Sequence, residues 1–215
     1  MNVLLVRHGE TTWNREGRYQ GRTDIALSEV GVEQARALAR RLASVPIAFA
    51  VASPLVRARA TAEAVTEARG IALELDAGLV EISHGAWEGQ LASDVERSHA
   101  EMFGTWKTTP TRDTPAGPNA ETLGDVDARA WPVLERATSR LHGDQTVLVA
   151  AHDAVNRVLL CRVLGLPLAR IWSFRQASAT LNVLSGPSLD ALQIVRLNDC
   201  EHVAPIVGSP PHRAL

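Results

Sequence analysis

The amino-acid sequence predicts an α/β fold, arranged as a three-layer α/β/α sandwich around a mostly parallel, mixed central sheet. Two observations predict it. Runs of consecutive aliphatic residues alternate with segments of helical periodicity, and a strand that is aliphatic at every position has to be covered on both faces. The last two expected strands alternate apolar and polar residues and complete the sheet. The pattern is typical of folds in which helices cover both faces of one sheet.

The first half of the chain is expected to contain three strands and two helices. Ser28 suits the N-cap of the first helix, because apolar or small residues recur at helical spacing from Val32 through Ala35 to Leu38. Pro54 suits the first turn of the second helix, where its missing N–H group costs nothing. The expected elements are a strand at 2–7, a helix at 28–43, a strand at 49–53, a helix from 54 to about 69 and a short strand at 73–76.

The second half is expected to place a helix and a long loop ahead of a further helix and the strongest strand, QTVLVAA. The loop at 104–119 is rich in Thr, Pro and Gly, and its length is typical of a surface excursion. Trp131-Pro132 predicts a kink, or a helix made of two segments. The expected elements are a helix near 91–103, the loop at 104–119, a helix at roughly 122–142, a strand at 145–151, a helix at 154–164 and strands near 179–184 and 190–197.

Length and composition favour a single soluble domain, residues 1–215, with a lid-like excursion around 85–121. A formal net charge of −2 gives no reason to expect a nucleic-acid partner, and no apolar run reaches the length of a membrane span. Cys161 and Cys200 are too few for a disulfide framework, which favours a reduced, cytoplasmic setting. Lys107 is the only lysine and follows no glycine-rich turn, which argues against a Walker-type loop and a Schiff-base mechanism.

Cationic or potentially cationic side chains follow three of the expected strands. Arg7 and His8 end the first strand, Arg57 comes shortly after the second, and His152 follows the strand at 145–151. Ligands of open α/β sheets bind outside the carboxyl ends of the strands, so these side chains are expected to converge. Gathering them is costly unless an anion compensates, and a phosphate dianion matches arginine forks and helix N-termini. The pattern therefore predicts a phosphate pocket.

Five motifs occur in the order found in the histidine phosphatase superfamily, and the chain resembles its phosphoglycerate mutase-like branch. The likeness covers nearly the whole chain. It implies the family's mixed, mostly parallel sheet flanked by helices, which agrees with the fold predicted from periodicity. The motifs are LLVRHGETTWN, YQGRTDIALSEVGVEQA, SPLVRARATA, EISHGAWEG and VAAHDAVNRVLL.

The resemblance also implies a role for particular residues. His8 would be the nucleophile that accepts the phosphoryl group, and Glu81 would protonate the leaving oxygen and then activate water. Arginines would replace a metal cation, so neither a metal nor a cofactor is expected. The other implied residues hold phosphoryl oxygens, namely Arg7, Arg57 and His152, or lie in segments that contact phosphate and substrate, namely Asn14, Gln20 and Gly21.

Several segments differ from the family pattern or resemble one subgroup of the family. Asp153 stands where relatives commonly have glycine; it is interpreted as the N-cap of the helix starting at 154, or as a residue that orients His152 or contacts a cationic substrate group. AGPNAET replaces a common PGGES, which predicts a differently shaped lid. His84 lies in a setting similar to the EIDHG of metal-independent phosphoserine phosphatases, where it would bind a substrate carboxylate or be hydrogen-bonded within a turn. The tail RLNDCEHVAPIVGSPPHRAL also looks like theirs.

The leading hypothesis is a phosphomonoester hydrolase that acts on a small phosphorylated metabolite through a phosphohistidine intermediate, with phosphoserine as the best single guess. A phosphoglycerate mutase, or a phosphatase of sugar phosphates or α-ribazole phosphate, is the alternative, although glycolytic mutases are usually longer than 215 residues. A catalytically inactive phosphate-binding protein ranks low because all five core residues are present. A metal-binding protein ranks low because the seven histidines form no HxxxH or HExxH pair. A homodimer is compatible with the resemblance.

Overall fold

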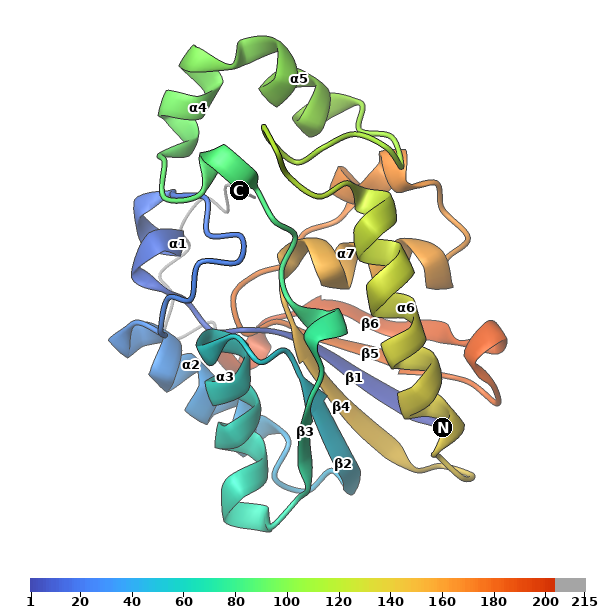
Figure 1. The fold of residues 1–215 in the computed structure, drawn as a ribbon. Coiled ribbons are helices and arrows are strands. Elements are labelled where there is room, and N and C mark those ends of the chain that lie inside the picture. Colours follow the sequence, from blue (N-terminus) through green and yellow to red (C-terminus); the bar gives the residue numbers. More distant parts are fainter. Residues whose placement is uncertain (204–215) are drawn as a thin grey trace.

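The computed structural model describes residues 1–203 and contains one six-stranded mixed sheet (Figure 1). Its strands are β1 (Asn2–Arg7), β2 (Ile47–Ala52), β3 (Leu73–Leu75), β4 (Thr146–Ala151), β5 (Leu181–Ser185) and β6 (Gln193–Asp199). They lie side by side in the order β3-β2-β4-β1-β5-β6. The first four of these are mutually parallel, and β5 is antiparallel to both of its neighbours. The predicted mixed, mostly parallel sheet is confirmed.

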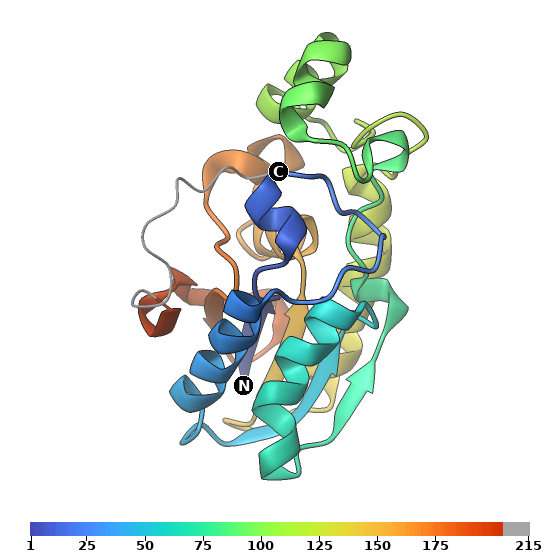
Figure 2. The same cartoon turned by 90° about the vertical axis from the view of Figure 1, so that its left-hand side faces the viewer.

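Helices cover both faces of this sheet, so the predicted three-layer arrangement is also confirmed (Figures 1 and 2). Alternate residues of β1 face different layers because strand side chains alternate. Val3 and Leu5 join the core that includes residues of α6 and α7, whereas Leu4 and Val6 pack with Leu38 of α2 in the other core. The helices are α1 (Thr12–Glu16), α2 (Glu29–Arg41), α3 (Val56–Thr66), α4 (Ala92–Ser98), α5 (Ala100–Thr108), α6 (Leu123–Ser139) and α7 (Asp153–Val163).

The helix caps explain where several elements begin. Ser28 is the N-cap of α2, as predicted, and its side chain accepts a hydrogen bond from the backbone N–H of Gly31. Thr11 and Asn14 form a reciprocal capping box at the start of α1. Val32, which the periodicity placed on the apolar face of α2, is 37 % exposed and lies at the margin of that face.

Four predicted helices differ from those in the structure. The helix expected from 54 is α3, which begins at Val56 with Leu55 as its N-cap, so Pro54 precedes the helix and is not in its first turn. The helix expected near 91–103 is two helices, α4 and α5, because His99 between them has a non-helical backbone conformation, and α5 takes up the first five residues of the expected loop at 104–119. α6 runs through Pro132 without interruption, since buried residues on both sides of the proline, including Trp131 and Val133, keep packing against the core. α7 begins at Asp153, one residue earlier than predicted.

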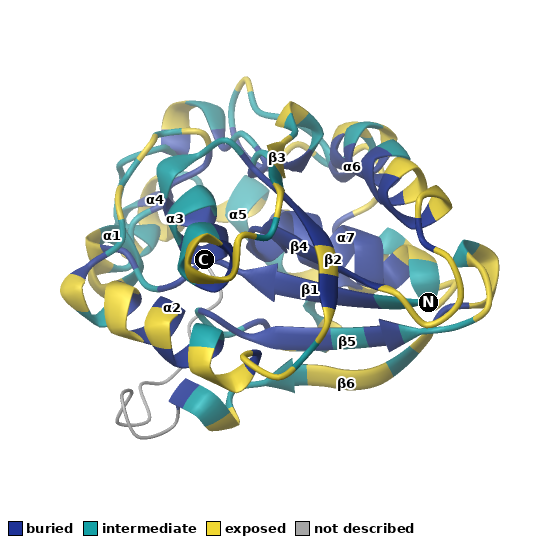
Figure 3. Cartoon of the chain, turned by 90° about the horizontal axis from the view of Figure 1, so that it is seen from below, coloured by how far each residue is buried: buried dark blue, intermediate teal, exposed yellow. Residues whose placement is uncertain are grey.

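Burial is highest at the centre of the sheet and lowest at its two edge strands, β3 and β6, neither of which contains a buried residue (Figure 3). All six residues of β4 are buried, whereas β6 is mostly exposed or half-buried. No helix within residues 1–203 is both long enough and apolar enough to span a membrane. The predicted likeness of the C-terminal tail extends into residues 204–215, which lie outside the described residues.

Candidate active site

The four cationic or potentially cationic side chains predicted to converge do lie together, at the carboxyl ends of three parallel strands. Arg7 is the last residue of β1 and is in register with Ala151, the last residue of β4, so His8 and His152 follow at the same level. Their rings lie 5.1 Å apart between centroids. Arg57 is in the first turn of α3, after β2, and lies close enough to lower the pKa of both histidines. We call Arg7, His8, Arg57 and His152 the cationic nest.

His8 is held in one tautomer. Its Nδ1 atom lies 2.7 Å from the carbonyl oxygen of Gly9, and a carbonyl can only accept, so Nδ1 carries the proton and Nε2 carries the lone pair. Burial, followed by the positive charges of Arg57 and Arg7, lowers the pKa of His8 well below 6.5. The ring is therefore neutral at neutral pH, and Nε2 is available as a nucleophile.

The two arginines are partly fixed and partly unpartnered. Arg57 is fully buried and donates to the backbone carbonyls of Gly21 at 2.7 Å and Thr23 at 2.9 Å. Burial lowers its pKa to about 10, which indicates a costly site for a cation. Arg7 donates to the carbonyl oxygen of Gln176. Within residues 1–203, the buried Nε atoms of both arginines have no hydrogen-bond acceptor. Anionic oxygens would supply the missing acceptors.

His152 also has one ring nitrogen that is hydrogen-bonded within residues 1–203 and one that is not. Its Nε2 atom shares a hydrogen bond of 2.8 Å with the hydroxyl of Ser53, the residue that follows β2. Its Nδ1 atom is buried and has no partner in the described part of the chain. Burial and the charge of Arg57 lower the pKa of His152 well below 6.5. Sequence reasoning missed Ser53, although its position directly after a parallel strand was the available signal.

Glu81 lies next to the cationic nest as a buried carboxyl group. One oxygen accepts from the backbone N–H of Ile82 and the other from that of Asp153, each at 3.0 Å. Burial and, secondarily, the negative charge of Asp153 raise the pKa of Glu81, while Arg57 and Arg7 lower it by less. Its protonated form therefore persists to a higher pH than that of an ordinary glutamate, as a general acid requires.

The N-cap interpretation of Asp153 is wrong, because α7 starts one residue earlier and His152 occupies the cap position. The Asp153 carboxylate instead joins two arginines. One oxygen accepts from Nε of Arg157 at 3.1 Å, and the other lies 3.5 Å from Nη1 of Arg7. Asp153 is thus the charged link between α7 and the end of β1.

The predicted contact residues after His8 are organised mainly by their neighbours. Asn14 uses its side-chain oxygen in the capping box with Thr11. The Gln20 side-chain oxygen accepts a 2.8 Å hydrogen bond from the Thr11 hydroxyl. Gly21 has φ +53°, and a Cβ atom there would lie 2.2 Å from a carboxylate oxygen of Glu88, so only glycine fits. This loop holds the carbonyl that fixes Arg57.

His84 is buried beside an aromatic cluster. Its Nδ1 atom donates to the carbonyl oxygen of Ala116 at 2.8 Å, and its ring centroid lies 4.6 Å from that of Tyr19 and 6.0 Å from that of Trp106. Burial lowers the pKa of His84 to about 4, so the ring is neutral at neutral pH and its Nε2 atom is an acceptor. The hydrogen bond joins it to the segment 85–121.

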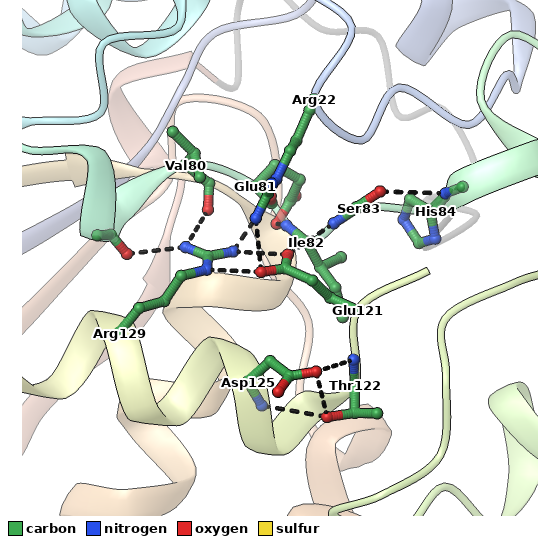
Figure 4. Close-up of polar contacts among 12 residues, drawn as sticks. Arg22, Val80, Glu81, Ile82, Ser83, His84, Glu121, Thr122, Asp125 and Arg129 are labelled. Carbon is green, nitrogen blue, oxygen red and sulfur yellow. Dashed lines mark hydrogen bonds and ion pairs between the residues drawn. The ribbon is translucent and has the colours of Figure 1, made fainter. Parts of the chain in front are cut away.

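A second group of charged side chains, Arg22, Glu121 and Arg129, lies beside Glu81, and we call it the Glu121 cluster (Figure 4). Arg129 donates to both carboxylate oxygens of Glu121 at 3.0 Å. It also donates to the backbone carbonyls of Gly78, Val80 and Glu81. Sequence reasoning did not single out this cluster. It fixes the backbone that carries Glu81.

The polar groups of the site do not form a metal centre. Throughout residues 1–203, no three His, Cys, Asp or Glu side chains are grouped so that they could hold a metal ion. The nest is instead rich in N–H donors and guanidinium charge, which suits an anion.

Comparison with known proteins agrees with this chemistry. Residues 3–200 match the family model of the histidine phosphatase superfamily, branch 1. The chain is 36 % identical to phosphoserine phosphatase 1 of Hydrogenobacter thermophilus over 184 residues, 86 % of each chain. It is 34 % identical to the adenosylcobalamin/α-ribazole phosphatase of Salmonella typhimurium over 178 residues, 81 % of this chain and 85 % of that one.

The fold has equally clear relatives among solved structures. A mycobacterial glucosyl-3-phosphoglycerate phosphatase, solved as a complex with VO3, superposes with a TM-score of 0.84 and 28 % identity, covering 92 % of this chain and 98 % of that one. The matched family and the phosphatases among the relatives make the chain a phosphohydrolase.

Proposed function

Because the chain belongs to the histidine phosphatase superfamily, we propose that it hydrolyses a small phosphomonoester through a phosphohistidine on His8, with phosphoserine as the substrate. One observation carries this proposal: the Nδ1–H of His8 is committed to the Gly9 carbonyl, which leaves the Nε2 lone pair in a nest of half-satisfied cations. A neutral imidazole nitrogen surrounded by N–H donors suits attack on a phosphoryl group.

In the first step, Nε2 of His8 attacks phosphorus in line and the bond from phosphorus to the ester oxygen breaks. Arg7, Arg57 and His152 bind the three other oxygens and stabilise the charge on the transferring group. Their unpartnered N–H groups support this role, because a group that is satisfied only by the transition state costs no reorganisation during the reaction.

Glu81 supplies the proton that the leaving oxygen needs. Its raised pKa supports this assignment, since the carboxyl group has to be protonated when the ester bond breaks. The resulting carboxylate then takes a proton from water, which attacks phosphorus and releases neutral His8 and inorganic phosphate. Arg129 supports Glu81 from outside by holding its backbone carbonyl.

The choice of phosphoserine draws on the relative from Hydrogenobacter thermophilus and on His84. We assign His84 to the side of the site that receives the leaving group, as a contact to the substrate carboxylate. A ring with a pKa of about 4 has to take up a proton to pair with a carboxylate. Binding of phosphoserine is therefore expected to consume close to one proton at neutral pH, which calorimetry in buffers of different ionisation enthalpy measures directly.

Chemical quenching tests the nucleophile. After the wild-type protein is mixed with a ³²P-labelled phosphomonoester and quenched, we expect acid-labile, base-stable label on the protein. His8→Ala should carry none. Persistent labelling of His8→Ala would refute the assignment of His8, and saturable phosphate binding without turnover would instead indicate a binding protein.

A phosphate-release assay tests the substrate. The wild type and His84→Ala are each assayed with phosphoserine, phosphoglycerates, sugar phosphates, nucleotides and α-ribazole phosphate. We expect the highest kcat/KM for phosphoserine and a loss in the variant that is confined to substrates with a carboxylate. A uniform loss would remove the anchoring role of His84, and a preference for α-ribazole phosphate would favour the activity named for the relative from Salmonella typhimurium.

A further inference from the structure

We propose that Asp153 accepts a hydrogen bond from an ammonium group on the leaving group, which makes the enzyme selective for phosphorylated amino alcohols. This inference rests on the proposed phosphomonoesterase function and narrows its substrate class.

The first observation is a buried carboxylate of which only one oxygen accepts a hydrogen bond from the part of the chain that the structure describes. Asp153 is 6 % exposed, and its Oδ2 atom accepts from Nε of Arg157. Its Oδ1 atom makes no hydrogen bond to any residue that the structure describes. The nearest cation is Nη1 of Arg7 at 3.5 Å, which is an ion-pair distance but too long for a good hydrogen bond. A buried carboxylate oxygen of this kind favours a ligand that brings a donor.

The second observation is the position of Asp153 beside the proposed general acid. The backbone N–H group of Asp153 donates to the Oε2 atom of Glu81 at 3.0 Å. A general acid has to lie against the leaving oxygen, so Asp153 contacts two groups of the proposed reaction: Glu81 through its N–H group and Arg7 through its carboxylate. In phosphoserine and phosphoethanolamine, the ammonium nitrogen is two bonds from the carbon that carries the leaving oxygen.

The charges around the site permit a cation there. Arg7, Arg57, Arg157 and Lys107 carry four positive charges and Asp153 one negative charge, so a phosphate dianion leaves this set at +1, to which a zwitterionic leaving group adds no net charge. Arg157 is itself restrained, because it donates to the carbonyls of Ile171 and Phe174 and does not turn towards the substrate. An ammonium group beside Asp153 therefore meets one acceptor, Oδ1, that receives no hydrogen bond from residues 1–203.

Lys107 provides the opposite charge for a zwitterionic leaving group. Lys107 belongs to α5, in the segment 85–121. Its ammonium lies 4.7 Å from the centre of the Trp172 ring. Burial lowers the pKa of Lys107 to about 8, and the charge of Asp153 opposes that shift, so the two groups are close enough to interact.

The alternative role of Asp153 is positioning alone, in which it holds Arg7 and the Glu81 backbone contact and never touches the substrate. The two roles differ in their dependence on the substrate. Loss of a positioning residue impairs all phosphomonoesters alike, whereas loss of an ammonium acceptor impairs only those that carry the ammonium group.

The test compares Asp153→Asn with wild type on two substrates that carry an ammonium group, phosphoserine and phosphoethanolamine, and two that do not, phosphoglycolate and ethyl phosphate. We expect kcat/KM to fall by about 10- to 100-fold for the first pair relative to the second, the loss typical of one charge-assisted hydrogen bond. Asp127→Asn is the matched control, because Asp127 is an equally buried aspartate held by Arg112 and Arg162 away from the nest. An equal loss on all four substrates would leave Asp153 with positioning alone.

Binding separates failure of this inference from failure of the proposed function. Affinities of phosphoserine and phosphoglycolate are measured by calorimetry for His8→Ala with and without Asp153→Asn, so the result does not depend on turnover. If Asp153→Asn does not fold, the wild type's own preference for phosphoethanolamine over ethyl phosphate decides: a preference of tenfold or more supports the inference, and equal values overturn it.

Discussion

The cationic nest and the Glu121 cluster are neighbouring groups of charged residues that differ in how far their hydrogen bonds are satisfied. All three nitrogens of the Arg129 guanidinium donate within the protein, and Glu121 also accepts from Arg22 and from the backbone N–H of Ser83. In the nest, Nε of Arg57 has no acceptor within residues 1–203. Saturated charge stabilises the fold, whereas unsaturated charge is available to a ligand.

The difference has an energetic basis. A buried polar group without a partner costs about 1–3 kcal/mol, so a chain keeps several of them together only where a ligand repays the cost. Arg57 illustrates this, because its pKa is lowered to about 10, chiefly by burial. Arg129 shows no such conflict, since its donors meet a carboxylate and carbonyls. The comparison predicts opposite consequences when members of the two groups are replaced.

The largest effect is expected for Arg57→Met, which removes a phosphoryl-binding charge from the nest. We expect kcat/KM to fall by about 10³-fold or more, because the guanidinium stabilises charge on the transferring group. The melting temperature should change by less than about 5 °C, since relief of the buried charge offsets the two hydrogen bonds lost to Gly21 and Thr23. Steady-state kinetics and calorimetric melting measure both. A variant that unfolds while its folded fraction retains full activity would place Arg57 with the structural group.

Glu81→Gln tests a carboxyl group that lies between the two clusters. Loss of the general acid should lower kcat by about 10²–10⁴-fold. The stability should rise, because a raised folded-state pKa means that the native protein holds a proton that the unfolded chain loses above the ordinary value of 4.5. Stability of the wild type therefore falls as pH rises above that value, and the variant escapes the penalty. We expect its melting temperature to exceed that of wild type at pH 7 by about 2–4 °C and to match it near pH 4.

The same contrast explains what could be predicted from the sequence. Arg7, His8, Arg57 and His152 were predictable because aliphatic strands run directly into them, and the carboxyl ends of parallel strands share one edge. The Glu121 cluster was not, since Arg22 and Glu121 come from loops whose approach depends on tertiary packing. The family resemblance supplied Glu81, which periodicity alone left as an ordinary loop glutamate.

The errors in element boundaries have a similar origin. The break between α4 and α5 is produced by the backbone angles of a single residue, His99. No proline or glycine stands at that position to indicate the break in the sequence. The start of α7 was misplaced by one residue, since aspartate is so common at N-caps. Here Asp153 is drawn into the helix by its ion pair with Arg157, four residues later on the same face.

Arg129→Ala should break the Glu121 cluster with the opposite signature to Arg57→Met. The change removes two of the four hydrogen bonds that Glu121 accepts and the guanidinium donor to three carbonyl oxygens, so we expect a loss of about 2–4 kcal/mol in the free energy of unfolding, measured by denaturant titration. The kcat/KM per folded molecule should fall by no more than about tenfold. Arg22→Ala is the control, because that half-exposed arginine makes one ion pair to the same carboxylate and should cost below about 1 kcal/mol.

The smallest expected effect is a shift in the pH profile of kcat/KM. It would show whether Asp153, which lies outside the nest, acts on Glu81. Charged groups facing Glu81 are Asp153, which raises its pKa, and Arg57 and Arg7, which lower it. In Asp153→Asn the negative charge that raises the pKa of Glu81 is lost. The pKa of Glu81 should therefore fall, and the alkaline limb of kcat/KM should move to lower pH. With ethyl phosphate, which has no other ionisable group near the site, a profile that stays in place would mean that Asp153 does not act on Glu81. The acid limb should not move, because burial, Arg57 and Arg7 lower the pKa of His8, and Asp153→Asn leaves all three in place.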